Sequence, residues 1–117
     1  AVLRSNAKPS ARAFAMMGGR EWHMRGWERL EYTVRTGKTA LDDVYGMAAF
    51  EYLFSHPAEM QIFNDAMTEF SAIDSPAVAE AYSFDGIGSI VDVGGGHGLL
   101  LANILPSAQS SNARYSL

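Results

Sequence analysis

The sequence predicts an α/β chain in which a helical region comes first and one strand, a glycine-rich turn and a helix follow. Three observations support this order. Apolar residues recur at helical spacing over most of residues 11–81. Residues 89–93 are then short, apolar and rich in β-branched side chains, as in a buried strand of a parallel sheet. Four glycines between positions 94 and 98 lead directly into a second apolar run.

Short helices separated by glycine and proline make up the first part of the predicted helical region. Residues 11–17 form a helical turn that opens after Pro9 and Ser10. Residues 21–36 follow as one helix, because apolar positions recur at i, i+4, i+7 and i+11. Gly26 lies inside that helix, where glycine costs about 1 kcal/mol against alanine. We therefore expect Gly26 to pack closely against another element.

Four more helices and a strand complete the predicted order. A short helix covers residues 47–54, and a more periodic one begins at Pro57. Its broad apolar face carries Phe63, Ala66, Met67 and Phe70. Ser75 and Pro76 are expected to end it and to open another helix through residue 81. After the strand and the glycines, residues 97–105 are predicted to be a helix that Pro106 ends.

The composition excludes several classes of protein. A chain of 117 residues has room for one modest domain or a piece of a larger one. No run approaches the ~18 uncharged apolar residues of a membrane span, so we expect no membrane partner. The absence of cysteine rules out disulfides and thiolate chemistry, and the three histidines lack metal-ligand spacing. We assign no metal-binding residue and expect a reducing, cytoplasmic setting.

Charge is unevenly spread along the chain. Residues 1–40 hold eight Lys and Arg against three Asp and Glu, whereas residues 41–117 hold one Arg against ten acids. A basic segment can bind nucleic acid or direct a chain to an organelle. Basic residues do not alternate with stacking aromatics here, so we expect no nucleic-acid partner. Two differently charged surfaces of one soluble body explain the asymmetry more simply.

The glycine-rich turn VDVGGGHG is the main functional signal. A strand that turns at once into a helix leaves N–H groups unpaired, and glycines let a ligand approach the main chain. A phosphate-binding P-loop needs Lys followed by Ser or Thr after its last glycine, where this chain has Leu99 and Leu100. The dinucleotide fingerprint requires glycine at position 99.

The form that is present, Asp92 followed by G-x-G-x-G, suits a ligand with an amino-acid tail. Backbone amides can receive the carboxylate of such a tail, and Asp92 can attract its ammonium directly or through water. S-adenosylmethionine is a ligand of this kind. A purely structural tight turn is the alternative.

Several motifs place this turn in a family. They are Glu21-Trp22, the GKTA turn that begins at Gly37, Gly46-Met47-x-x-Phe50-Glu51-Tyr52 and Phe63-Asn64-x-x-Met67. Together with the glycine turn they closely resemble the S-adenosylmethionine-dependent O-methyltransferases of the caffeate and hydroxyindole type. The bacterial members that methylate polyketide and other aromatic natural products look nearest. The resemblance covers about residues 3–105.

The resemblance implies an enzyme that methylates a hydroxyl of a small aromatic or polyketide-type acceptor and works as a homodimer. Residues 1–10 then correspond to the end of an N-terminal winged-helix dimerisation domain. Residues 11–82 correspond to a helical connector and interface region. Residues 83–117 correspond to the start of a Rossmann-like domain that binds S-adenosylmethionine.

The resemblance also assigns site residues. The expected cofactor-binding residues are Asp92, Gly94, Gly95, Gly96, Phe54 and Ser71. The expected acceptor-binding residues are Phe50 and Met67, although Phe63, Met67 and Phe70 at helical spacing equally suit a hydrophobic core. The family's catalytic histidine comes beyond its fifth strand, so no catalytic residue is assigned to this chain, and His97 is not taken as the base.

Parts of the family pattern are missing. Asp92 is the last acid in the sequence, although an acid is expected about 20 residues after the glycines to hold a ribose. Residues 106–117 are polar, and we expect no second strand there. The chain is therefore expected to be a fragment that is inactive alone. A non-enzymatic helical dimerisation module is the alternative. Binding of a nucleotide sugar or NAD is rejected, because position 99 is Leu rather than glycine and the later acid is missing.

Overall fold

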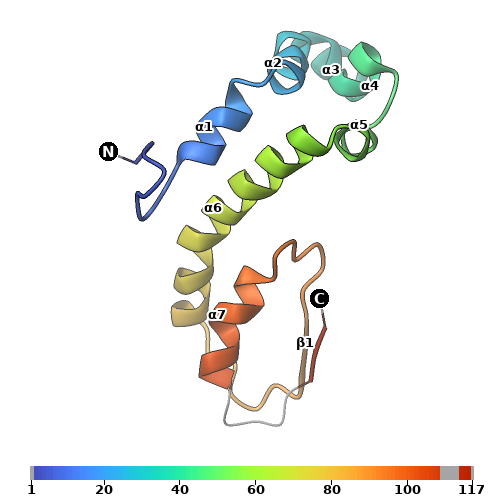
Figure 1. Ribbon diagram of the computed structural model, residues 1–117. Helices are drawn as coiled ribbons and strands as arrows, with labels where there is room; N and C mark the ends of the chain where they lie inside the picture. Colours follow the sequence, from blue (N-terminus) through green and yellow to red (C-terminus); the bar gives the residue numbers. More distant parts are fainter. Residues whose placement is uncertain (1, 109–113, 117) are drawn as a thin grey trace.

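The computed structural model describes residues 2–108 and 114–116. The helices are α1 (Arg12–Gly18), α2 (Glu21–Glu28), α3 (Leu30–Thr36), α4 (Ala40–Tyr45), α5 (Ala49–Ser55), α6 (Pro57–Ala81) and α7 (Leu99–Ala108), and the strands are β1 (Ser89–Val91) and β2 (Arg114–Ser116). α6 forms the spine of the molecule (Figure 1). α1 and α5 lie against its first half, α2 to α4 cluster near its N-terminal end, and α7 lies beside its second half.

The chain is elongated. Its radius of gyration is 17.7 Å, and its principal extents are 50 × 35 × 26 Å. A compact domain of this length has a radius of gyration of about 13 Å. The extended arrangement leaves large apolar side chains in solvent, among them Trp27, which is 61% exposed, and Val34, which is 76% exposed.

The main hydrophobic core lies where α1, α2 and α5 meet the first half of α6. Its buried members are Met17, Trp22, Leu53 and Ala66. Partly buried side chains surround them, namely Ala13, Leu41, Tyr45, Tyr52, Met60, Ile62, Phe63 and Met67. Three members of the predicted helical face, Phe63, Ala66 and Met67, are therefore confirmed as core residues. The fourth, Phe70, is not in the core: it is 42% exposed and meets the ring of Phe14 on α1.

A carboxylate on α6 holds the start of α2 in place. Glu59 accepts hydrogen bonds from Arg20 Nε at 2.8 Å and from Trp22 Nε1 at 3.1 Å, and it pairs with the second arm of the Arg20 guanidinium. The hydrogen bond from Arg20 lowers the pKa of Glu59 below its usual range, although burial opposes this shift. The charged form of Glu59 is thus the one that the fold favours.

The predicted single helix over residues 21–36 is wrong. The chain leaves the helical conformation at Arg29, whose φ is −99° and ψ is 16°, and a new helix begins at Leu30. α4, which was not expected, packs back against α2, and Arg29 pairs there with Asp43. The prediction that Gly26 packs against another element is confirmed, because a methyl group at this position would meet Leu41 at 3.5 Å.

The expected helix break at Ser75 and Pro76 is also wrong, because α6 continues through both residues to Ala81. Pro76 lacks an N–H, so one hydrogen bond along the helix is missing, and α6 bends in its second half (Figure 1). Ser75 is only 3% exposed. Packing of this half against α7 offsets the lost hydrogen bond.

The end of the described chain forms a strand–helix–strand unit. α7 runs to Ala108 rather than ending before Pro106, with Leu101 and Ile104 buried. β1 pairs in parallel with β2, with Ile90 opposite Tyr115. The expectation that residues 106–117 hold no strand is wrong, because a parallel ladder is made of backbone hydrogen bonds and does not require apolar side chains.

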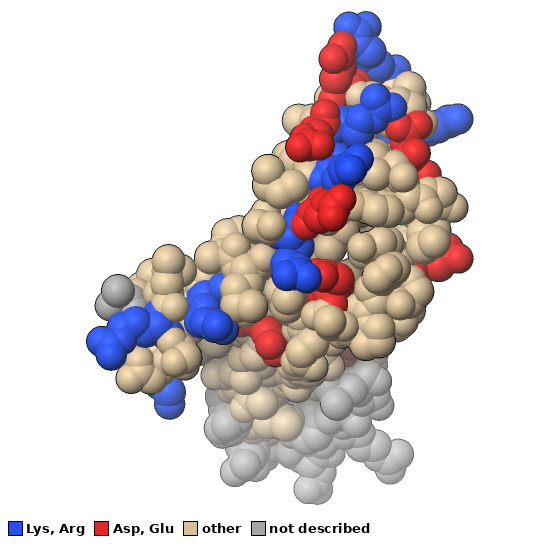
Figure 2. Space-filling model, turned by 45° about the horizontal axis from the view of Figure 1, so that its top comes forward, with Lys and Arg blue, Asp and Glu red and all other residues tan. Residues whose placement is uncertain are grey.

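Charges on the N-terminal helices are paired rather than gathered into one basic face. Figure 2 shows basic and acidic side chains interleaved in a band over the upper end of the molecule. The ion pairs are Arg20–Glu59, Arg25–Glu21, Arg29–Asp43 and Arg35–Glu31. Among the described residues, the helices are too short or too polar to cross a membrane.

The Glu59 network predicts a pH-dependent stability. Because its folded-state pKa is lowered, Glu59 contributes stability above the ordinary carboxyl pKa, and this contribution disappears as the pH falls through the folded value. Glu59→Gln should lower the free energy of unfolding at pH 7 by about 1–2 kcal/mol and flatten its fall between pH 5 and 3. Urea unfolding across this range measures both effects.

Glu51→Gln is the matched control, because Glu51 is exposed on α5. It should leave the pH dependence unchanged. An unchanged slope in Glu59→Gln would show that the Arg20 contact does not stabilise the fold.

Candidate functional site

The glycine turn between β1 and α7 is held in a conformation that suits glycine. Gly94, Gly96 and Gly98 have φ values of 74°, 56° and 70°. Residues with a side chain rarely adopt this left-handed backbone conformation. The positive φ values at these three positions therefore explain why glycine recurs. The Gly98 amide donates to the Gly95 carbonyl at 2.8 Å, and α7 begins directly afterwards. We call residues 94–98 the glycine loop.

Open space lies over the main chain at two of these glycines. A methyl group built on Gly94 or on Gly96 would have no other atom within 4 Å. A ligand could therefore lie directly against the backbone at this point. The loop thus offers room beside the N-terminus of α7, where backbone N–H groups have no partner within the helix.

The carboxylate of Asp92 is tucked beneath the loop. Its Oδ2 atom is buried and has no hydrogen-bond partner among residues 2–108 and 114–116. A methyl group on Gly95 would lie 2.6 Å from this atom, so only glycine leaves space for the carboxylate there. A buried carboxylate oxygen without a donor is costly. It is the kind of group that a ligand ammonium or a bound water would satisfy.

His97 ties the glycine loop to α6. Its Nδ1 atom lies 2.7 Å from the hydroxyl oxygen of Thr68, which also bonds the carbonyl of Asn64 at 2.9 Å. The sequence analysis did not identify Thr68. No local pattern could have found it, because the two partners are 29 residues apart in the chain.

The two cofactor-binding residues predicted outside the loop lie in different surroundings. Ser71 is half-buried on α6, one turn after Thr68, and thus on the side of the helix that the loop contacts. Phe54 lies at the end of α5 and is 75% exposed. Ser71 therefore lies one turn from the residue that contacts the glycine loop, whereas Phe54 is on the surface.

The two predicted acceptor-binding residues lie on or near the main core. Met67 packs against the buried cluster formed by Met17, Trp22, Leu53 and Ala66. Phe50 is 58% exposed and meets the ring of Phe63 edge to face, with the ring centroids 5.8 Å apart. Both assignments remain predictions.

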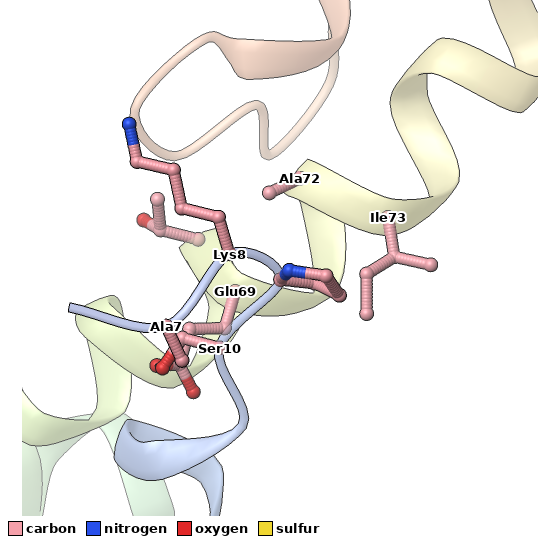
Figure 3. A pocket seen from close by; sticks show the side chains of 8 residues that line it. Ala7, Lys8, Ser10, Glu69, Ala72 and Ile73 are labelled. Carbon is pink, nitrogen blue, oxygen red and sulfur yellow. The ribbon is translucent and has the colours of Figure 1, made fainter. Parts of the chain in front are cut away.

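A hollow of about 620 Å³ lies between the N-terminal loop and α6 (Figure 3). Its lining residues are Ala7, Lys8, Pro9 and Ser10 from the loop and Thr68, Glu69, Ala72 and Ile73 from α6. Most of this lining is apolar. Thr68 belongs both to the wall of the hollow and to the contact with His97. The sequence analysis assigned no role to residues 7–10, because a loop without a motif carries no local signal.

Glu69 fixes the edge of this hollow. It accepts a hydrogen bond from Ser10 Oγ at 2.6 Å and one from the Phe14 amide at 3.1 Å, and so caps α1 from α6. Burial raises the pKa of Glu69, but the hydrogen bonds from Ser10 and from the first turn of α1 outweigh it and leave the pKa lowered. The hollow therefore has one charged wall within an apolar lining.

Comparison with known proteins shows which domain family the chain belongs to. Residues 27–110 match the O-methyltransferase domain family. The chain is 37% identical over 107 residues to phenazine O-methyltransferase PhzM of Lysobacter antibioticus, which covers 92% of this chain and 31% of that protein. The chain thus spans about a third of the length of the curated relatives it matches.

Solved structures agree with this assignment. LaPhzM superposes with a TM-score of 0.87 at 36% identity, over 99% of this chain and 34% of its own. NcsB1, an O-methyltransferase from neocarzinostatin biosynthesis, superposes with a TM-score of 0.76 at 28% identity, over 97% of this chain and 34% of its own. NcsB1 was solved in complex with S-adenosylmethionine and 2-hydroxy-5-methyl naphthoic acid.

The contact between Gly95 and Asp92 predicts the effect of one methyl group. Gly95→Ala should push the carboxylate out of its buried position and change the χ1 rotamer of Asp92. The free energy of unfolding should change by less than about 1 kcal/mol, because the displaced oxygen has no hydrogen bond to lose. Three-bond couplings to the Asp92 side chain report the rotamer.

Gly88→Ala is the matched control, because a methyl group there would meet nothing within 4 Å. Its couplings at Asp92 should equal those of the wild type. Unchanged couplings in Gly95→Ala would contradict the arrangement of Asp92 beneath the loop.

Proposed function

Because this chain belongs to the O-methyltransferase family, we propose that it is part of an enzyme that methylates a hydroxyl of a small aromatic or polyketide-type acceptor. S-adenosylmethionine is the proposed methyl donor. In this assignment, residues 1–10 end an N-terminal winged-helix dimerisation domain and residues 11–82 form the helical connector. Residues 83–117 begin the Rossmann-like domain that binds the cofactor.

One observation carries the proposal, namely the unpartnered Asp92 carboxylate beneath an open glycine loop. The two features fit the two ends of an amino acid. Asp92 attracts the ammonium, directly or through water, and the free N–H groups near Gly94 and Gly96 receive the carboxylate. The complex of NcsB1 with S-adenosylmethionine supports this choice of ligand.

The residues of this chain contribute binding and orientation. When bound, the cofactor supplies an activated methyl group. Asp92 and the glycine loop would hold its amino-acid end, and Phe54 and Ser71 are proposed to flank it. Placing a methyl group in line with an acceptor hydroxyl is mostly a matter of position, which is what such contacts provide. The general base that accepts the hydroxyl proton is assigned to a region outside this chain.

An apolar wall near the loop supports an aromatic acceptor. The hollow between the N-terminal loop and α6 shares Thr68 with the contact to the glycine loop, so an acceptor there would lie near the cofactor. NcsB1 was solved with a hydroxylated naphthoic acid, a flat aromatic compound. Phe50 and Met67 remain the proposed acceptor-binding side chains from the family resemblance.

A non-enzymatic dimerisation module is the second candidate function, and one observation favours it. Trp27, Leu30 and Val34 are exposed on α2 and α3, where a single soluble domain rarely gathers large apolar side chains. The same helices would serve a homodimer of the parent enzyme. Sedimentation at several concentrations tests self-association, and a monomer throughout counts against the module.

Selective binding of the amino-acid end tests the proposed function. We expect S-adenosylhomocysteine and L-methionine to shift the amide resonances of the glycine loop, with affinities weaker than micromolar because the family's second acid is missing. 5′-Methylthioadenosine, which lacks the amino-acid tail, should leave those resonances unchanged. Nuclear magnetic resonance titration of the 117-residue chain to millimolar ligand measures this difference.

Asp92→Asn is the matched variant, because it keeps the shape of the side chain and removes its charge. It should abolish the response to L-methionine. Identical responses to all three ligands, or none at all, would contradict the proposed function. Micromolar affinity for S-adenosylhomocysteine would instead overturn the claim that this chain holds an incomplete site.

A further inference from the structure

The hydrogen bond between Thr68 and His97 determines which nitrogen of the imidazole carries a proton. A threonine hydroxyl has one hydrogen, and the Asn64 carbonyl at 2.9 Å can only accept. When Thr68 donates its hydroxyl proton to Asn64, the hydroxyl oxygen is left to accept from Nδ1 of His97 at 2.7 Å. In this arrangement Nδ1 of His97 carries a hydrogen.

His97 is also the only residue of the glycine loop with a side chain beyond hydrogen. Gly96 and Gly98, which flank His97, have φ values in the left-handed region. Glycine can also adopt many other backbone conformations. A loop of this composition loses much conformational entropy when it becomes ordered. A single side-chain contact to a long helix restricts it before any ligand arrives.

We propose that His97 is a positioning residue, which donates from Nδ1 to Thr68 and holds the glycine loop against α6 in the shape that accepts the ligand. This inference rests on the proposed function only for the identity of the ligand. The contact between His97 and Thr68 does not depend on that identity. Ordering the loop beforehand raises the affinity for the ligand, because the conformational entropy of the loop is lost on folding rather than on binding. Thr68 is the fixed partner, since its own hydroxyl is anchored to the α6 backbone.

The position of Thr68 links the loop to the rest of the site. Ser71 lies one turn further along α6, and Thr68 also lines the hollow beside Glu69. The His97 contact therefore sets the distance between the glycine loop and the helix that carries the proposed acceptor wall. Loss of this contact should loosen the loop without unfolding the core, which lies along the first half of α6.

Two ligand-free measurements on the 117-residue chain test the proposal. Long-range ¹H–¹⁵N spectra at a pH above about 8, where free imidazole is neutral, should show His97 protonated at Nδ1. In Thr68→Val the proton should move to Nε2, the nitrogen that free histidine prefers. Amide order parameters of Gly94 and Gly96 should fall from about 0.8 to below about 0.6 in the same variant.

Conservative variants separate positioning from general stability. Thr68→Ser keeps the hydroxyl, and His97→Asn keeps a donor near the position of Nδ1, so both should retain the ordered loop. His97→Leu should lose it. Thr36→Val is the matched control, because it removes the same kind of hydroxyl-to-carbonyl bond, to Tyr32, at the end of α3. It should leave the loop order parameters unchanged.

The outcomes are distinct from those of the ligand titration, because no ligand is present. A wild-type His97 protonated at Nε2, or a loop whose order is the same in Thr68→Val and wild type, would overturn the proposal. A loop that loosens equally in Thr36→Val would also overturn it, because the effect would then be one of general stability. Failure of the chain to bind L-methionine would contradict the proposed function and leave this contact standing.

Discussion

The long helix α6 packs against two separate parts of the molecule. The first half of α6 supplies Ala66 to the main core and Glu59 to the start of α2, and Glu69 near its middle caps α1. Its second half packs against α7. Because each cluster is fastened to the same helix, their relative position depends on α6 staying continuous.

This constraint explains how a two-stranded sheet can carry a defined loop. β1 and β2 together span three residue pairs, which is too little to order a loop by themselves. α6 provides a second support through Thr68, which contacts His97. The buried Oδ2 atom of Asp92 lies beneath the same loop and has no hydrogen-bond partner among the described residues. The loop that α6 supports is therefore also the place of the unsatisfied carboxylate oxygen.

Local patterns predicted the features that depend on neighbouring residues. The core face of α6 around Ala66 and the strand–glycine–helix order follow from spacing and composition, and both are present. The predicted burial of the strand is wrong, because Val91 is 69% exposed and Val93 is 92% exposed. The contacts that join the elements link residues 14 to 59 positions apart, such as Arg29 with Asp43 and Ser10 with Glu69, and spacing within a helix does not reveal them. The local rule failed at Pro76, where packing on α7 outweighs one lost hydrogen bond, and at β2, where pairing depends on the backbone.

The continuity of α6 can be measured directly. The chain contains no cysteine, so Gln61→Cys with Glu80→Cys gives one pair of spin labels, both on exposed positions of α6. An unbroken helix places the two backbones about 28 Å apart, and double electron–electron resonance should show one narrow distance distribution. A broad or two-peaked distribution, or a much shorter distance, would show that α6 breaks near Pro76 and would contradict the account.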